Sequence, residues 1–280
     1  MTFHHERRLD RALHHLEHLK AEVKAWSEER PYRVWTEFDV DELYKLTWLE
    51  VLEQSPSDLS LIVGDCIHNL RSALDNLVHE LALAYIGIDP LPEGRARGLE
   101  FPVFGDREMT TRECRNKIGC IDPRAQADIK GLQPYNRGER FRRDPLWQLH
   151  QLSNMDKHRL PHVVLFAPQA IAFFVPDNLT ASDIQSISGP IETCAPIARY
   201  PAFDKTGAKV DVYPTPSFSV GFSQRVPEEL RGWSVPTRLA LISDHIISKV
   251  LPSLHPYLTR MPLVEVNQPY CLLRDKSVRS

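Results

Sequence analysis

The chain has 280 residues, of which 42% are hydrophobic and 25% are charged, and its formal net charge is −3. This length and composition predict a soluble globular protein with a sizeable core. The slightly acidic balance removes the global argument for nucleic-acid binding. No stretch approaches the roughly 20 apolar residues that cross a bilayer, and Met1–Arg8 lacks the apolar run of a signal peptide. We therefore expect a cytoplasmic protein with no membrane partner.

Three elements are predicted in the first third of the chain. Apolar residues recur at helical spacing from about His5 to Glu29, which predicts a first helix. Alternating apolar residues then predict a hairpin with strands at Tyr32–Phe38 and Tyr44–Trp48, and with its turn at Asp41-Glu42. A long amphipathic helix is predicted over Asp58–Ile86.

From Gly87 to Arg143 repeated prolines predict an irregular segment that covers the helical core, with one clear helix start at Asp122-Pro123. Between Arg95 and Arg159 there are fourteen Lys and Arg against nine Asp and Glu, which leaves open a basic patch or a loop region of mixed charge. A second long helix is predicted from Asp144-Pro145 until Pro161.

The residues after Pro161, taken together with the elements before them, predict the fold class. Residues Pro161 to Gln224 are rich in alternating and β-branched residues and predict antiparallel strands. A last helix follows Pro236 and is expected to end before Pro252. We therefore predict an α+β protein, with a helical bundle core and an antiparallel β-rich insertion before the C-terminal helix. Its parts are residues 1–160 (helical core with the hairpin and the covering segment), 161–224 (β-rich) and 225–280 (last helix and tail), in one elaborated domain.

The polar side of the long helix is unlike a solvated face. Between Asp65 and His79 it has neither Lys nor Glu, which an ordinary exposed face would carry. The side chains there are short hydrogen-bonding or titratable groups: Asp65, His68, Ser72, Asp75 and His79, with Arg71 at the edge. This composition is typical of a pocket wall or a subunit interface.

The helix after Asp144 has a comparable face, formed by His150, Asn154, Lys157 and His158. If the two faces meet, the cluster can cleave RNA without metal, because histidine titrates near neutrality and cations stabilise a phosphorane. It can also bind a divalent metal through His and Asp, or be a buried structural network that fixes helix register. The sequence leaves these three alternatives open.

Other sites have little support in the sequence. The five cysteines form no Cys-x-x-Cys pair, and we expect them reduced, with Cys66 buried in the long helix. No Walker loop, dinucleotide glycine pattern or His-Glu-x-x-His motif occurs, so we expect no cofactor and no resident metal.

Two stretches resemble the signatures of a family of uncharacterised bacterial proteins: Gly64-Asp-Cys-Ile-His-Asn-Leu-Arg-Ser-Ala-Leu-Asp-Asn76 and Asn154-Met-Asp-Lys-His-Arg159. The first is similar to the Arg-x4-His motif of HEPN domains, which are helical bundles that often act as dimeric RNases in toxin and defence systems. In this chain Asn76 stands at the histidine position, and the next histidine is His79.

The resemblance implies a HEPN-like protein that acts on RNA, as a homodimer and without metal. We predict Arg71, His79 and His158 as catalytic residues, and His68, Asp75, His150, Asn154, Lys157 and Arg159 as binding residues. The alternatives are a non-catalytic interaction protein, whose polar faces form a dimer interface or a buried network, and a metal-dependent hydrolase.

Overall fold

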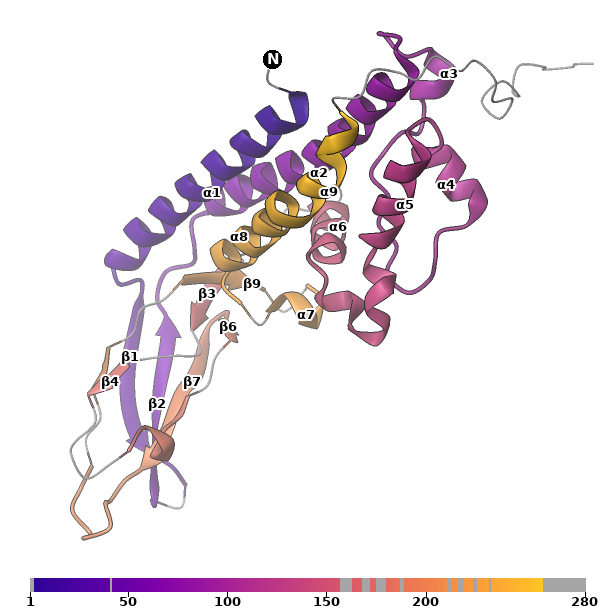
Figure 1. Cartoon of the computed structure of the whole chain (residues 1–280). Coiled ribbons are helices and arrows are strands. Elements are labelled where there is room, and N and C mark those ends of the chain that lie inside the picture. Colours follow the sequence, from indigo (N-terminus) through magenta and orange to yellow (C-terminus); the bar gives the residue numbers. More distant parts are fainter. Residues whose placement is uncertain are drawn as a thin grey trace, which may run out of the picture. The chain divides into compact units, whose positions relative to one another are not determined.

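The computed structural model of the chain describes residues 3–40, 42–156, 163–167, 172–174, 180–186, 189–210, 213–215, 219–223, 226–231 and 233–258. These residues form an α+β protein, as predicted (Figure 1). Its helices are α1 (His4–Glu28), α2 (Ser57–Ile86), α3 (Glu93–Ala96), α4 (Thr111–Ile118), α5 (Pro123–Gly131), α6 (Pro145–Asp156), α7 (Glu228–Arg231), α8 (Val235–His245) and α9 (Leu251–Leu254). The other helical segments are the 3₁₀ helices η1 (Pro134–Arg143), η2 (Ala181–Asp183) and η4 (His255–Tyr257), and the π-helical η3 (Ile246–Val250).

The described strands pair antiparallel in sheets of order β1-β2-β7-β5, β6-β3-β9 and β4-β8. Their bounds are β1 (Tyr32–Phe38), β2 (Tyr44–Val51), β3 (Val163–Ala167), β4 (Ala172–Phe174), β5 (Gln185–Ser186), β6 (Gly189–Ile191), β7 (Cys194–Pro201), β8 (Tyr213–Thr215) and β9 (Ser219–Phe222). The predicted hairpin is confirmed as β1 and β2, with Trp35 opposite Trp48. It joins β7 from the later β-rich segment in one sheet.

The chain divides into two compact units made of interleaved segments. The first contains the described parts of Met1–Leu13, Ile67–Asn154 and Leu241–Ser280, and the second those of His14–Cys66 and Met155–Ala240. All the strands described above belong to the second unit. Within the described ranges, no helix combines the length and the apolar character that crossing a bilayer requires.

The part of helix α2 from Ile67 onward contributes apolar side chains to the core of the first unit. Its leucines recur every three or four residues, and Leu70, Leu74, Leu77 and Leu81 are each at most 1% exposed. The predicted helix over Asp58–Ile86 is therefore confirmed, one residue longer at its start. Cys66 on the same helix is fully buried, as predicted.

The prediction of an irregular segment over Gly87–Arg143 is wrong, because α3, α4 and η1 lie there. The helix start predicted at Asp122-Pro123 is confirmed, since α5 begins at Pro123 with Asp122 as its N-cap. Helix α4 begins with a capping box, in which Thr110 Oγ1 accepts from the Glu113 N–H and the Glu113 carboxylate accepts from the Thr110 N–H. The bidentate contact from Arg107, helped by these bonds, lowers the pKa of Glu113 to about 2. The Thr-x-x-Glu spacing of that box was readable in the sequence.

The prediction that the last helix ends before Pro252 is also wrong. Helical backbone angles continue from α8 through η3 into α9, which contains Pro252 in its first turn. The Leu251 N–H bonds to the Ile246 carbonyl across the wide π turn. Proline is tolerated there because its fixed φ suits the first turn of a helix, where an N–H is not needed.

Candidate functional site

The predicted polar side of α2 lies outside the core. His68 and His79 are exposed, and Ser72 and Asp75 are half-buried. This stripe carries the predicted site residues of the first signature. Its residues take part in two polar arrangements of the first unit, one around Arg71 and Asp75 and one beside His79.

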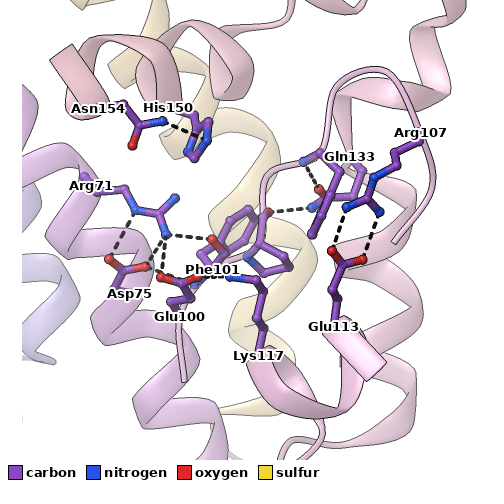
Figure 2. A network of polar contacts seen from close by, with 12 residues as sticks. Arg71, Asp75, Glu100, Phe101, Arg107, Glu113, Lys117, Gln133, His150 and Asn154 are labelled. Carbon is purple, nitrogen blue, oxygen red and sulfur yellow. Dashed lines mark hydrogen bonds and ion pairs between the residues drawn. The ribbon is translucent and has the colours of Figure 1, made fainter. Parts of the chain in front are cut away.

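Arg71 and Asp75 form a close ion pair one turn apart on α2 (Figure 2). Arg71 Nη2 donates to Asp75 Oδ1 at 2.8 Å, and Arg71 Nε donates to Asp75 Oδ2 at 3.2 Å. The Arg71 side chain is only 12% exposed. Its fork geometry on a carboxylate is the strong, directional form of a charge-assisted contact.

The same pair fixes the backbone that follows α3. Arg71 Nη2 also donates to the Phe101 carbonyl at 2.8 Å, while the Phe101 N–H donates to Asp75 Oδ1 at 2.9 Å. Phe101 itself is fully buried. Arg71 and Asp75 therefore bind both polar backbone groups of one residue and hold an apolar side chain in the core.

Glu100 and Lys117 extend this network, as Figure 2 shows. Lys117 on α4 pairs with Glu100, whose second oxygen lies 3.9 Å from Arg71 Nη2. Burial, together with the charge of Arg71, lowers the pKa of Lys117. Two cations are thus balanced by two carboxylates. This network is of the structural kind that the sequence left open, but its partners for Arg71 and Asp75 include Glu100 and Lys117, which were not predicted.

His150 and Asn154 lie one turn apart on α6 and are joined by a 3.0 Å contact between Asn154 Nδ2 and His150 Nε2. Figure 2 draws this pair together with the Arg71 network. The predicted residues Lys157, His158 and Arg159 lie outside the described residues, so their roles stay predictions.

A cleft of about 800 Å³ lies in the first unit between the start of α1 and the second half of α2. The residues that line it are His4, Arg7, Arg8, Arg11, Asn69, Asn76, His79, Glu80, Leu83 and Asp89. The lining thus includes His79 and also Asn76, which stands at the HEPN histidine position. Arg71 is not part of this lining, so the cleft does not bring Arg71 and His79 together.

Glu80 joins the two helices at the cleft. Its Oε1 accepts from the main-chain N–H of His4 at 2.5 Å, and its Oε2 is in contact with His5 Nδ1. His5 and Glu80 are 1% and 8% exposed. The carboxylate therefore lies at the positive end of the α1 dipole and fixes the first turn of that helix.

The arginines of α1 were missed by the sequence analysis. Arg7, Arg8 and Arg11 are exposed side chains that line the cleft. Their spacing of one and four residues places them on one side of a helix, but the same pattern is common on solvated helices. The spacing of the arginines could be read in the sequence, whereas the packing of α2 beside this part of α1 could not.

Some of the cations between Arg95 and Arg159 are paired with carboxylates. Contacts to carboxylates involve Arg107 with Glu113, Lys117 with Glu100, Arg124 with Asp122 and Arg137 with Asp144. These contacts are those of a region of mixed charge, and the basic patch stays an open prediction.

The metal alternative is not favoured by any cluster of ligands. In the described part of the chain, no group of three or more His, Cys, Asp and Glu side chains is arranged to hold a metal ion.

Comparisons with models of protein families, with curated proteins and with solved structures find no match to this chain. The resemblance to HEPN domains therefore stays a prediction.

Proposed function

We propose that this chain is a HEPN-like protein that binds RNA and cleaves it without a metal ion. The observation that carries the proposal is the position of His79, a titratable side chain, in a cleft that three arginines also line. Arginine forms bidentate contacts with phosphate, and histidine is the side chain best suited to proton transfer near neutral pH.

In the proposed reaction one histidine takes the proton from a ribose 2′-hydroxyl, and the 2′-oxygen attacks the adjacent phosphorus. The bond from phosphorus to the 5′-oxygen breaks, and a second acid protonates the departing oxygen. The products are a 2′,3′-cyclic phosphate and a 5′-hydroxyl. His79 and His158 take the acid and base roles, and Lys157 contacts phosphate together with the arginines that line the cleft. Arg71, predicted from the sequence as a phosphate contact, lies outside the cleft lining and is engaged by Asp75 and the Phe101 carbonyl. The protein acts in the cytoplasm as a homodimer.

The rival function is a non-catalytic interaction protein. The observation that favours it is the Arg71 network, in which the guanidinium is engaged by Asp75 and by the Phe101 carbonyl. A guanidinium committed in this way stabilises the fold of the first unit whether or not RNA is bound.

The test is to incubate the full chain with end-labelled single-stranded RNA and with tRNA in EDTA. Variants His79→Ala, His158→Ala and Arg71→Ala are compared with His14→Ala, which alters an exposed histidine of α1 outside the cleft lining. We expect cyclic phosphate ends from the wild type and from His14→Ala, and their loss in His79→Ala while the melting temperature is retained.

Two results would count against the proposal. If neither RNA is cleaved, in EDTA or with added divalent metal, the RNase function fails and the interaction protein becomes the better account. If cleavage occurs and His79→Ala is as active as His14→Ala, the chemistry does not use the cleft.

A further inference from the structure

Three guanidinium groups at the cleft, those of Arg7, Arg8 and Arg11, form no ion pair with a carboxylate of the described residues. Carboxylates lie within 4.0 Å of Arg33, Arg71, Arg107, Arg124, Arg137 and Arg199. Among the described residues, by contrast, the side chains of Arg7 and Arg11 have neither an ion pair nor a hydrogen bond, and Arg8 has a hydrogen bond to an amide. The cleft therefore contains positive charge that the fold does not neutralise directly.

Few acidic residues lie near Arg7, Arg8 and Arg11, and some of these are engaged by other groups. Glu80, which lines the same cleft, is engaged by the His4 N–H and by His5. Glu6 on α1 accepts from the Phe3 N–H at 2.9 Å. Asp89 is the other carboxylate of the lining. Because Glu80 is held at the start of α1, it does not form an ion pair with the arginines.

The spacing of the three arginines allows them to contact more than one anionic group. Arg7 and Arg11 are one turn apart, which is about 6 Å along the helix axis. Arg8 Nη1 donates to the buried Asn69 Oδ1 at 3.3 Å, and this bond orients the side chain toward α2. A guanidinium has five N–H donors, so the bond to Asn69 uses one of those that Arg8 offers.

We infer that Arg7, Arg8 and Arg11 form a phosphate-binding row that takes two successive phosphates of an RNA chain. The inference rests on the proposed function for the identity of the ligand, and adds a binding site on α1 that is separate from the proton transfer at His79. Each arginine contributes a contact to the phosphate backbone of the RNA, which does not depend on the base sequence. Arg8 is the best oriented of the three, because it is bonded to Asn69.

The test measures binding of the full chain to a short fluorescein-labelled oligouridylate by anisotropy, over a series of NaCl concentrations in EDTA. The variants are Arg7→Ala, Arg8→Ala and Arg11→Ala. Matched controls are Arg112→Ala and Arg115→Ala, which remove the same charge from exposed positions of α4 outside the cleft lining. Melting temperatures confirm that each variant is folded, as expected for exposed side chains.

We expect the slope of log K against log salt to become shallower by about 0.7 for each row arginine removed, the value for one phosphate contact on a single strand. The controls should keep the wild-type slope. Unlabelled inorganic tripolyphosphate should compete with the oligonucleotide more strongly than orthophosphate does, because it spans two positions of the row. A slope that is equally reduced in the α4 controls would overturn the inference, as would equal competition by the two phosphates.

The outcomes separate this inference from the proposed function. If the oligonucleotide binds with the expected slopes and no cleavage occurs, the row stands and the RNase proposal fails. If cleavage depends on His79, and if Arg7→Ala, Arg8→Ala and Arg11→Ala give the same salt slope as the α4 controls, the RNase proposal stands and the inferred phosphate-binding row is wrong. Absence of binding at low salt would refute the row.

Discussion

The Glu80 carboxylate accepts a hydrogen bond of 2.5 Å from the main-chain N–H of His4, and this bond joins α2 to the first turn of α1. The two residues are 76 positions apart in the sequence. The cleft between the helices therefore depends on a carboxylate that lies on one helix and binds the positive end of the other.

Glu80→Ala should lower the free energy of unfolding by about 1–3 kcal/mol, because it leaves the His4 N–H and the buried His5 ring without their acceptor. Glu80→Gln should cost less, since the amide oxygen still accepts from His4. Urea denaturation followed by circular dichroism measures both. The control is Glu53→Ala, an exposed position, and equal losses in Glu80→Ala and Glu53→Ala would contradict the role of Glu80.

Arg71→Ala should destabilise the protein by roughly 2–3 kcal/mol, because the hydrogen bonds that it removes involve charged groups and anchor the Phe101 backbone. Asp75→Ala should cost a similar amount. The double variant should be less destabilised than the sum of the two single losses, because both act on one interaction. Strictly additive losses in such a cycle, with Arg112→Ala as the exposed control, would show that the pair is not coupled.

The stability of the protein should fall when the pH is lowered from 7 to 5, and His245 should account for part of the fall. Burial lowers the pKa of His245 below its ordinary value of 6.5, against the opposing charge of Asp144 and with help from Arg137 and Lys249. The unfolded chain therefore takes up a proton at a higher pH than the folded one. The contribution of His245 to stability is therefore fully present above the pKa of this histidine in the unfolded chain, and it is lost as the pH falls below that pKa.

His245→Gln should flatten this part of the pH dependence, since glutamine does not titrate. Melting temperatures at a series of pH values measure the effect. His14→Gln, at an exposed position, should leave the profile unchanged. An identical profile in the wild type and His245→Gln would show that His245 makes no contribution.

Cys66 and Cys194 should differ sharply in reactivity. Burial raises the pKa of the Cys66 thiol to about 12, and Cys194 is exposed. Because the thiolate is the reactive form, a thiol reagent such as DTNB should modify Cys194 in the folded protein and Cys66 only after unfolding. Cys194→Ser should remove a fast phase of the reaction, whereas Cys66→Ser should leave the fast phase intact. Rapid labelling of Cys66 under native conditions would indicate local opening of α2.

Sequence periodicity predicted the elements whose contacts are local or repeated. The leucines of α2 recur at helical spacing, so the helix was predictable to within one residue at its start. The strands β1 and β2 alternate in hydrophobicity and follow one another directly, so their pairing was predictable as well. Helix α4 was missed, because its apolar residues are few and its capping box was not used.

The candidate site was harder to predict, since it depends on contacts between distant segments. The Arg71–Asp75 pair is local and was recognised as polar, but its bonds to the Phe101 backbone could not be read from spacing. The arginines of α1 looked like an ordinary solvated face. Only the contact of Glu80 with His4 shows that they border a cleft.

The cleft also offers a way to find ligands without an assay for activity. Its two sides come from segments far apart in the sequence, so the unfolded chain does not present the arginines beside Asn69 and His79. A ligand that contacts both sides binds the folded state alone, and at about 100 times its dissociation constant it adds roughly 2.7 kcal/mol of stability. Nucleotides and other anions can thus be ranked by the melting temperature of the wild type against that of Arg8→Ala.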